Sequence, residues 1–448
     1  MRYFYLLFTG ALITSIGTGM TTFALSVDAF QTYGTASVVA AIQLAGFAPL
    51  VLTTPIAGVL ADRFDRRILM IIGDGGSMLG LALVLWNVTQ PDPQLSVTLV
   101  GLVLSSLLAG CTEPALRATV SDVVPPTHYQ RSSGLLQIAA SSKFLLSPIM
   151  AAGLLAIAGL PSVLVLDMST CIITVGCTIL VRRAIGTKTV SGNHDSIRAE
   201  LLGGYHIITQ TQPVWTVVMI FTALIVVLGG LQTLFKPILL PLTSVSMESI
   251  AESISATGLI AGGAVVSILS NKSPWRLISL GAGLIGVGML LLPLVPHPAW
   301  ITLAAFVVFF ALAVVNAGGD VVVRTHIPNA FQGRVWGVIG FISQLGFLVA
   351  YLITGPLADL GFEPLLAQGG LLANSLGSVI GSGPGRGSAL LVGISGFGAL
   401  GLSLLAKQVG AALATRATQT GTPPREKPDD PSSDTLNRHQ EECLAVTS

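Results

Sequence analysis

Charge is scarce in this chain of 448 residues, because only 10% of them are Asp, Glu, Lys or Arg, against about 25% in soluble domains. This scarcity excludes an ordinary soluble protein. The net charge of +1, without any basic cluster, argues against a nucleic-acid partner. Four cysteines form no CxxC pair and six histidines show no ligand spacing, so no disulfide framework and no metal site are expected.

Catalytic patterns are also missing. No nucleophile, acid and base recur at spacings that suggest hydrolysis, so an enzyme is not expected. Gly281, Gly283 and Gly286 spell a dinucleotide fingerprint, but they lie inside an apolar run with no preceding strand. We interpret them as helix-packing glycines and expect no cofactor.

Long apolar runs are what the sequence has instead, since 52% of its residues are hydrophobic. A membrane-spanning helix needs about 20 apolar residues, and twelve such runs are separated by short polar breaks. They predict an all-α membrane protein with twelve transmembrane helices in two six-helix bundles. The predicted spans are 4–30, 36–61, 68–88, 95–117, 134–159, 161–181, 214–240, 250–270, 276–295, 300–323, 335–358 and 388–406.

Lys and Arg fall almost entirely on one side of this predicted topology. The opposite side holds only Arg386, while Lys143 and Lys236 lie within spans. Because cytoplasmic loops carry the excess of Lys and Arg, we expect both termini to lie in the cytoplasm. We expect the protein itself to lie in the plasma (inner) membrane.

The sequence divides into four parts. An amino-terminal bundle (1–181) and a carboxy-terminal bundle (214–406) flank a cytoplasmic linker (182–213). Ile197, Leu201, Tyr205 and Ile208 recur in the linker at helical spacing, which predicts an amphipathic helix on the membrane surface, or simply a linker helix. The polar tail, 407–448, is expected to be disordered.

An internal repeat relates the two bundles. Glu113 and Arg117, one helical turn apart, precede a Pro-x5-Arg-x2-Gly pattern that contains Arg131. Asp320 and Arg324 precede the same pattern in the second half, where its arginine is Arg334. Two such bundles with a cavity between them can expose the cavity to either side in turn, which predicts a carrier.

The loop between the second and third spans carries a family resemblance. Gly58-Val-Leu-Ala-Asp62-Arg63-Phe-Asp65-Arg66-Arg67 resembles the signature loop of the major facilitator superfamily, although Asp65 stands where many members have a second glycine. The resemblance implies that Asp62 faces the amino terminus of the eleventh span near Val335, and that Arg66 pairs with Glu113 or Asp122. The implied inner gate comprises Gly58, Asp62, Arg63, Arg66, Arg67, Glu113, Arg117, Asp320, Arg324 and Arg334; alternatively, these charges only anchor loops.

Other stretches narrow the resemblance. Val123-Val-Pro125 through Gly134, Leu166-Asp167-Met-Ser169 and Ile327-Pro328 through Val335 resemble the branch of enterobactin-type siderophore exporters and macrolide efflux proteins. The stretch from Ser147-Pro148 to Gly153 resembles a motif of antiporting exporters, with some of the residues of that motif replaced.

Charges within the spans are candidates for function, because a charge near the bilayer centre costs on the order of 2.5–3.5 kcal/mol. Glu113 is the first candidate for proton coupling, followed by Asp74 and Asp167; a permanent structural ion pair is the alternative. Asp28 and Lys236 occupy equivalent positions on the first and seventh spans, so we expect them to pair as an outer gate, or else to extend independently toward the interface.

These features predict a secondary active transporter that exports amphipathic small molecules, such as a drug, siderophore or secondary metabolite, by proton antiport. Alternatives are an inward carrier of lipid or nutrient and a non-transporting receptor or scaffold. We expect a monomer in the lipid bilayer, with a small molecule and a proton as its ligands. Polar residues within spans are candidates for the substrate cavity: Thr22, Gln137, Lys143, Gln232, Asn316 and Gln344.

Overall fold

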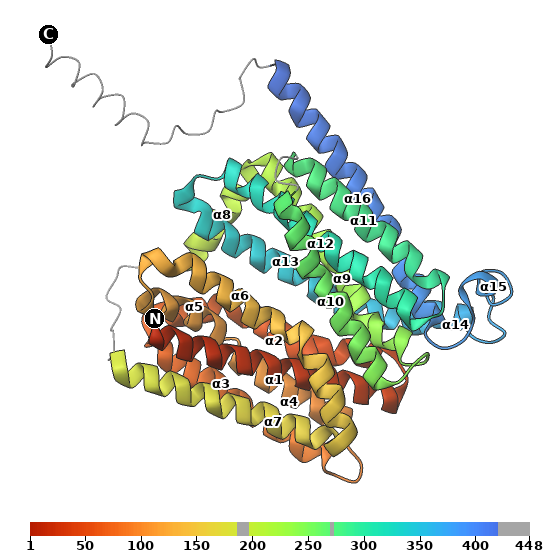
Figure 1. Ribbon diagram of the computed structural model, residues 1–448, viewed down its shortest axis with the longest axis horizontal. Coiled ribbons are helices and arrows are strands. Elements are labelled where there is room, and N and C mark those ends of the chain that lie inside the picture. Colours follow the sequence, from red (N-terminus) through yellow and green to blue (C-terminus); the bar gives the residue numbers. More distant parts are fainter. Residues whose placement is uncertain (186–196, 269–272, 420–448) are drawn as a thin grey trace, which may run out of the picture.

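A computed structural model describes residues 1–185, 197–268 and 273–419, and this part of the chain is helical and contains no strand. Figure 1 shows two helical bundles side by side. The first contains α1 (Arg2–Tyr33), α2 (Ala36–Arg63), α3 (Arg66–Val88), α4 (Leu95–Ala109), α5 (Thr112–Val123), α6 (Tyr129–Leu145) and α7 (Ser147–Ile185), with the short η1 (Pro126–His128) before α6. The second contains α9 (Gln212–Leu239), α10 (Val245–Ile268), α11 (Pro274–Leu291), α12 (Pro298–His326), α13 (Asn329–Leu357) and α16 (Arg386–Gln419).

Short elements complete the second bundle. They are η2 (Leu292–Leu294), the π-helical turn η3 (Ala358–Phe362), α14 (Glu363–Leu366) and α15 (Gly377–Ile380). The last three lie in the connection from α13 to α16, which Figure 1 shows protruding from one end of the molecule.

Eleven helices in the described ranges are long and apolar enough to cross a membrane. One of them, α7, is interrupted at Gly159, whose φ of 74° is a left-handed conformation that favours glycine. Pro161 then starts a new helical segment. Residues before the break extend α6, and those after it form a separate span, so the described chain agrees with the prediction of twelve spans.

Each bundle has its own apolar core. In the first, α1 packs on α7 and α3 on α4; in the second, α11 packs on α12 and α16. Glycines permit close helix contact: a Cβ on Gly80 of α3 would collide with the carbonyl oxygen of Gly101 on α4. Small residues at such contacts are how membrane helices gain packing energy.

The linker contains the predicted helix, α8 (Ile197–Gln210). Ile208 is fully buried against Val214 and Val335 of the second bundle, and Tyr205 stacks edge-on against Trp215. Its carboxy-terminal part therefore packs on protein. The side chains of Ile197 and Leu201 lie outside the described part of the structure.

The tail departs from expectation at its start. Residues 407–419 continue α16 as helix, so the prediction of disorder from 407 was wrong for this stretch. The segment is rich in alanine, a strong helix former, and Val409 and Leu413 pack on the core of the second bundle. The predicted disorder of 420–448 concerns residues that the structure does not describe.

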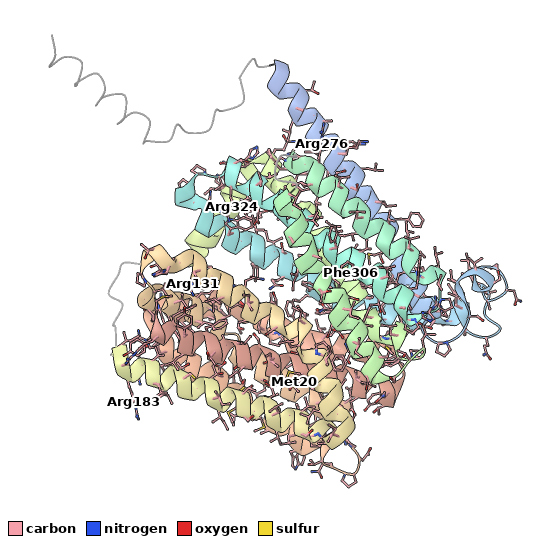
Figure 2. The ribbon with its side chains drawn as sticks, viewed as in Figure 1. Met20, Arg131, Arg183, Arg276, Phe306 and Arg324 are labelled. Carbon is pink, nitrogen blue, oxygen red and sulfur yellow. The ribbon has the colours of Figure 1, made fainter. Side chains whose placement is uncertain are left out.

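The two bundles meet at one end and diverge at the other. Figure 1 shows them diverging toward the end that carries the N-terminus and α8, which we call the linker side. They converge toward the end that carries α14 and α15, which we call the distal side. Figure 2 shows Arg131, Arg183 and Arg324 at the linker side, as the repeat predicts for Arg131 and Arg324.

Candidate transport pathway and its gates

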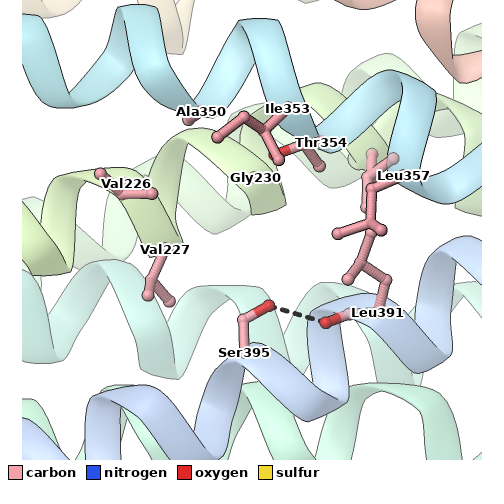
Figure 3. Close-up of a pocket in the computed structure, with 10 residues that line it drawn as sticks. Val226, Val227, Gly230, Ala350, Ile353, Thr354, Leu357, Leu391 and Ser395 are labelled. Carbon is pink, nitrogen blue, oxygen red and sulfur yellow. Dashed lines mark hydrogen bonds between the residues drawn. The ribbon is translucent and has the colours of Figure 1, made fainter.

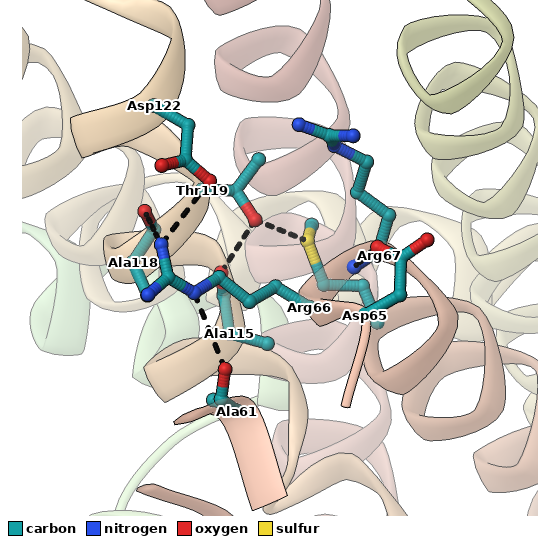
Figure 4. Close-up of polar contacts among 9 residues, drawn as sticks. Ala61, Asp65, Arg66, Arg67, Ala115, Ala118, Thr119 and Asp122 are labelled. Atoms are coloured by element: carbon teal, nitrogen blue, oxygen red, sulfur yellow. Dashed lines mark hydrogen bonds and ion pairs between the residues drawn. The ribbon is translucent and has the colours of Figure 1, made fainter. Parts of the chain in front are cut away.

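The signature loop is held by charge on the linker side (Figure 4). Arg66 donates to a carboxylate oxygen of Asp122 at 3.1 Å and to the carbonyl oxygens of Ala118 at 3.0 Å and Ala61 at 3.2 Å. Of the two acids expected to pair with Arg66, the structure therefore selects Asp122. These bonds tie the start of α3 to the ends of α2 and α5.

Asp65, the departure from the usual signature, also has a role in the structure. Its side chain accepts from the backbone N–H of Arg67 and so caps α3. The same carboxylate pairs with Arg182 at the end of α7, at 2.9 Å.

Of the other signature residues, Gly58 has open space where a Cβ would lie, Arg63 is exposed and Arg67 is buried. The side chains of Asp62 and Arg334 are outside the described part.

Glu113 pairs with Arg117, as helical spacing predicts. The distance is 2.8 Å, but the two side chains are 66% and 69% exposed. Asp320 and Arg324 are likewise exposed on α12 and interact electrostatically. Exposed pairs contribute little to stability, and these two pairs lie on exposed faces of α5 and α12.

Asp74 and Asp167 differ from Glu113 because both are almost completely buried in the first bundle, at 3% and 2% exposure. Asp74 accepts from the hydroxyl of Thr112 at 2.9 Å, and Asp167 accepts from Thr21 at 2.6 Å. The two carboxyls, on α3 and α7, interact electrostatically. One oxygen of Asp74 has no hydrogen-bond partner among the described residues.

Lys143 belongs to the same cluster, because its charge acts on Asp167. Its side chain packs close to Gly19 of α1, where a Cβ would lie 2.9 Å from the Lys143 stem. The cluster thus places three ionisable groups, on α3, α6 and α7, beside α1, whose Thr21 donates a hydrogen bond to Asp167.

Lys236 has partners other than the predicted one. Its ammonium lies 2.7 Å from a carboxylate oxygen of Glu252 and 3.6 Å from one of Glu248. Within the described ranges it makes no ion pair with Asp28, so the structure corrects the predicted outer pair. The reason is geometric: α9 and α10 are joined by a short turn, and Glu248 and Glu252, four residues apart on α10, face the last turn of α9.

The distal contact joins α2 to α13. The carboxylate of Asp359, just beyond α13, accepts from the backbone N–H groups of Ala36 at 2.9 Å and Ser37 at 2.7 Å. These N–H groups form the amino terminus of α2, which favours a negative charge. One turn earlier, a Cβ on Gly355 would lie 2.7 Å from Ser37 Cα, so only glycine permits this approach.

The contact continues toward the middle of both helices. The ring of Phe47 on α2 lies edge-on against Tyr351 and Phe347 of α13, with centroids 5.9 and 5.7 Å apart. Beside them, the hydroxyl of Thr233 on α9 donates to Gln43 of α2 at 2.9 Å. Residues 347, 351, 355 and 359 recur every four positions, so one stripe of α13 covers the distal half of α2.

Sequence reasoning missed Asp359, although a signal was present. Gly355-Pro-Leu-Ala-Asp359 repeats the Gly-x-Leu-Ala-Asp order of Gly58-Val-Leu-Ala-Asp62 in the signature loop. One copy ends α2 on the linker side and the other ends α13 on the distal side.

The predicted cavity residues differ in exposure and in their hydrogen bonds. Gln232 accepts from the Tyr351 hydroxyl at 2.8 Å, and the Thr22 hydroxyl donates to its own helix. Gln137 and Asn316 are exposed, while Gln344 is half-buried. A separate pocket of about 170 Å³ lies between α9, α13 and α16 (Figure 3), and its lining is apolar except for Thr354 and Ser395. None of the predicted cavity residues lines it.

Comparison with known proteins identifies the family. The family model described as Major Facilitator Superfamily matches residues 7–351. The chain belongs to the Major Facilitator Superfamily. It is therefore a multi-pass membrane transporter and not an enzyme, in agreement with the signature loop and the twelve spans.

Several relatives are efflux proteins. Macrolide efflux protein A of Streptococcus pyogenes is 24% identical over 368 residues, which cover 80% of this chain and 89% of that protein. The multidrug efflux pump Tap of Mycolicibacterium fortuitum is 26% identical over 377 residues, covering 79% and 88%. These relatives agree with the efflux branch that the sequence resembles.

Solved structures share the fold. A bacterial homologue of the human lysosomal transporter Spinster, in an inward-facing and unoccupied conformation, superposes with a TM-score of 0.70 over 92% of this chain and 98% of that one, at 12% identity. The nucleoside transporter NupG gives a TM-score of 0.68 at 12% identity, covering 91% and 99%.

Proposed function

We propose that this protein exports amphipathic small molecules in exchange for protons, by exposing a cavity between its two bundles to each side of the membrane in turn. The observation that carries the proposal is the similarity to macrolide and multidrug efflux proteins over about four fifths of the chain. The substrate class is a drug, siderophore or secondary metabolite with apolar surface.

The orientation belongs to the same proposal. The linker side, which carries nearly all Lys and Arg of the connections, faces the cytoplasm together with both termini. The conformation then has its outer side closed by the α2–α13 contact and its bundles apart on the cytoplasmic side. The protein acts as a monomer in the plasma (inner) membrane.

Buried carboxyls are the proposed proton carriers. Asp74 and Asp167 are removed from water, unlike the exposed Glu113, so their charge is costly unless a proton or a cation compensates for it. Lys143 is placed to compensate for the charge of Asp167 in one conformation.

The inner gate lies around the signature loop. Arg66 and Asp122 belong to it, and Asp62 and Arg334 are proposed to join them when the cytoplasmic side closes.

Efflux from proteoliposomes tests the proposal. Purified protein is reconstituted, a fluorescent amphipathic macrolide or dye is loaded, and its exit is followed with and without an imposed pH gradient. When the gradient drives protons in the direction opposite to substrate exit, we expect that exit to become at least several-fold faster. Exit that is indifferent to the gradient would refute antiport, and no protein-dependent exit for any of a panel of amphipathic compounds would refute export.

A further inference from the structure

Two carboxyls and one ammonium are buried together near the distal end of the second bundle. Lys236 is 4% exposed and Glu248 is fully buried, while the side chain of Glu252 is 25% exposed. Lys236 lies in the last turn of α9, and the two glutamates lie one turn apart in the first two turns of α10. We call these three residues the distal triad.

The distances separate the two glutamates. Glu252 makes a direct, charge-assisted hydrogen bond with the Lys236 ammonium at 2.7 Å. Glu248 Oε1 lies 3.6 Å from the same ammonium, which is too long for a hydrogen bond. Neither oxygen of Glu248 has a hydrogen-bond partner within the described ranges.

Charge balance follows from this geometry. If all three groups were ionised, the triad would bury one uncompensated negative charge, which is among the most costly arrangements in a protein interior. Lys236 and Glu252 neutralise each other. Glu248 has no donor for a carboxylate, so the arrangement is neutral when Glu248 carries a proton.

No further charged side chain compensates for Glu248 in the described structure. Among the described residues, the charged side chains that act on it are those of Lys236 and Glu252. The other charged or histidine side chains on the elements that pack against α10, or on neighbouring α1, make no ion pair with Glu248. They are Arg2, Asp28, Arg131, Lys143, Asp167, Arg182, Arg183, His297, Asp320, Arg324 and His326.

The triad also touches the other bundle. The Lys236 ammonium lies over the ring of Phe23 on α1, 4.5 Å from its centroid, in the geometry of a cation–π contact. Because α1 belongs to the first bundle, separation of the bundles at the distal side removes this contact. The same motion admits water to the triad, where an ionised Glu248 is then tolerated.

We propose that Lys236, Glu248 and Glu252 form a proton-binding site in which Glu248 takes up a proton from the distal side and thereby allows that side to close. The step is a simple protonation: the Glu248 carboxylate becomes a neutral carboxyl, and no other bond changes. The inference rests on the proposed function for its orientation, since the proton comes from outside the cell only if the distal side faces outward.

Distance measurements between the bundles test the site without a substrate. Spin labels at two exposed distal positions, Gln31 and Asn374, report closure of the protein in lipid nanodiscs as the pH is varied. In the otherwise unchanged protein we expect the closed-to-open ratio to rise up to tenfold for each unit of falling pH, as uptake of one proton requires. In E248Q, which mimics the protonated side chain, the distal side is expected to stay closed with a ratio that changes less than twofold.

A second variant and a control make the test decisive. In E252Q, Glu248 is the sole counter-ion of Lys236, so closure needs no proton and the pH dependence is again lost. D92N removes an exposed carboxyl in the distal turn between α3 and α4 and is expected to behave as the unchanged protein. Wild-type pH dependence in both E248Q and E252Q would overturn the proposal.

Efflux distinguishes this inference from the proposed function. If a pH gradient drives efflux through E248Q as well as through the unchanged protein, the distal triad is not the proton-binding site, and the proposal of antiport is retained. If closure follows pH as described but no gradient drives efflux, the triad is retained as the proton-binding site and the proposal of antiport is refuted.

Discussion

Asp359 at the end of α13 accepts two backbone N–H groups, those of Ala36 and Ser37, at the start of α2. The carboxylate thus crosses from one bundle to the other and compensates for the positive end of a helix. The matching Gly-x-Leu-Ala-Asp sequence of the signature loop ends α2 at Asp62, on the opposite side of the molecule. An aspartate therefore lies at the end of α2 and another just beyond the end of α13, on opposite sides of the molecule.

Removal of the Asp359 carboxylate is expected to favour opening of the distal side. Two charge-assisted hydrogen bonds are lost in D359A, and with a net contribution of about 2 kcal/mol the closed-to-open ratio falls about 30-fold. D359N keeps one acceptor and should fall between D359A and the unchanged protein. Spin-label distances between positions 31 and 374 measure the ratio, and an unchanged D359A ratio would contradict this role.

A side chain at position 355 is expected to prevent close approach of α13 to α2. In G355V the added atoms meet Ser37 and Ala40, so the distal side should stay open and transport should fall at least tenfold. G398V is the matched control, because Gly398 on α16 has open space where a Cβ would lie. Equal transport by the two variants, at equal amounts in the membrane, would be inconsistent with the packing described.

Loss of the Arg66–Asp122 pair is expected to weaken the attachment of α3 to α5. Both side chains are about four fifths buried, so D122A removes a charge-assisted hydrogen bond from a partly buried guanidinium. The free energy of unfolding, or the stability of the inner-closed state, should fall by about 1–3 kcal/mol. R117A, which breaks the exposed pair with Glu113, should cost less than about 1 kcal/mol. Thermal unfolding in detergent compares the two, and the reverse order would exclude this assignment.

Asp167 and Glu113 are expected to differ in proton coupling. D167N retains the hydrogen bond from Thr21 but cannot exchange a proton, so a pH gradient should no longer accelerate efflux, while exchange of substrate down its own gradient continues. E113Q, at an exposed position, should respond to the gradient as the unchanged protein does. If instead E113Q loses the response and D167N keeps it, the first candidate from sequence is right and the buried acid is structural.

Much of the fold could be predicted from sequence because it depends on local patterns. Apolar runs give the spans, and a helical spacing of four gives the Glu113–Arg117 pair. The Arg66–Asp122 pair followed from a family resemblance. The eleven long helices and the break at Gly159 agree with the predicted spans.

The contacts between helices could not be obtained in the same way. Lys236 was expected to pair with Asp28 by symmetry, yet its partners are Glu248 and Glu252 on the adjacent α10. Glu248 was placed outside the predicted eighth span, which began at 250, so its burial was not anticipated. Tail residues 407–419 are helical because Val409 and Leu413 find a core to pack on, which composition alone does not reveal.

Reciprocal motion of the two sides is the central claim, and paired distances in one lipid environment measure it most directly. One label pair reports the distal side (positions 31 and 374), and a second reports the linker side at Ser133 of α6 and Thr325 of α12, both exposed. When substrate or pH is changed, we predict that one distance lengthens as the other shortens. Two distances that stay fixed, or that lengthen and shorten together, would contradict alternating exposure of a cavity between the bundles.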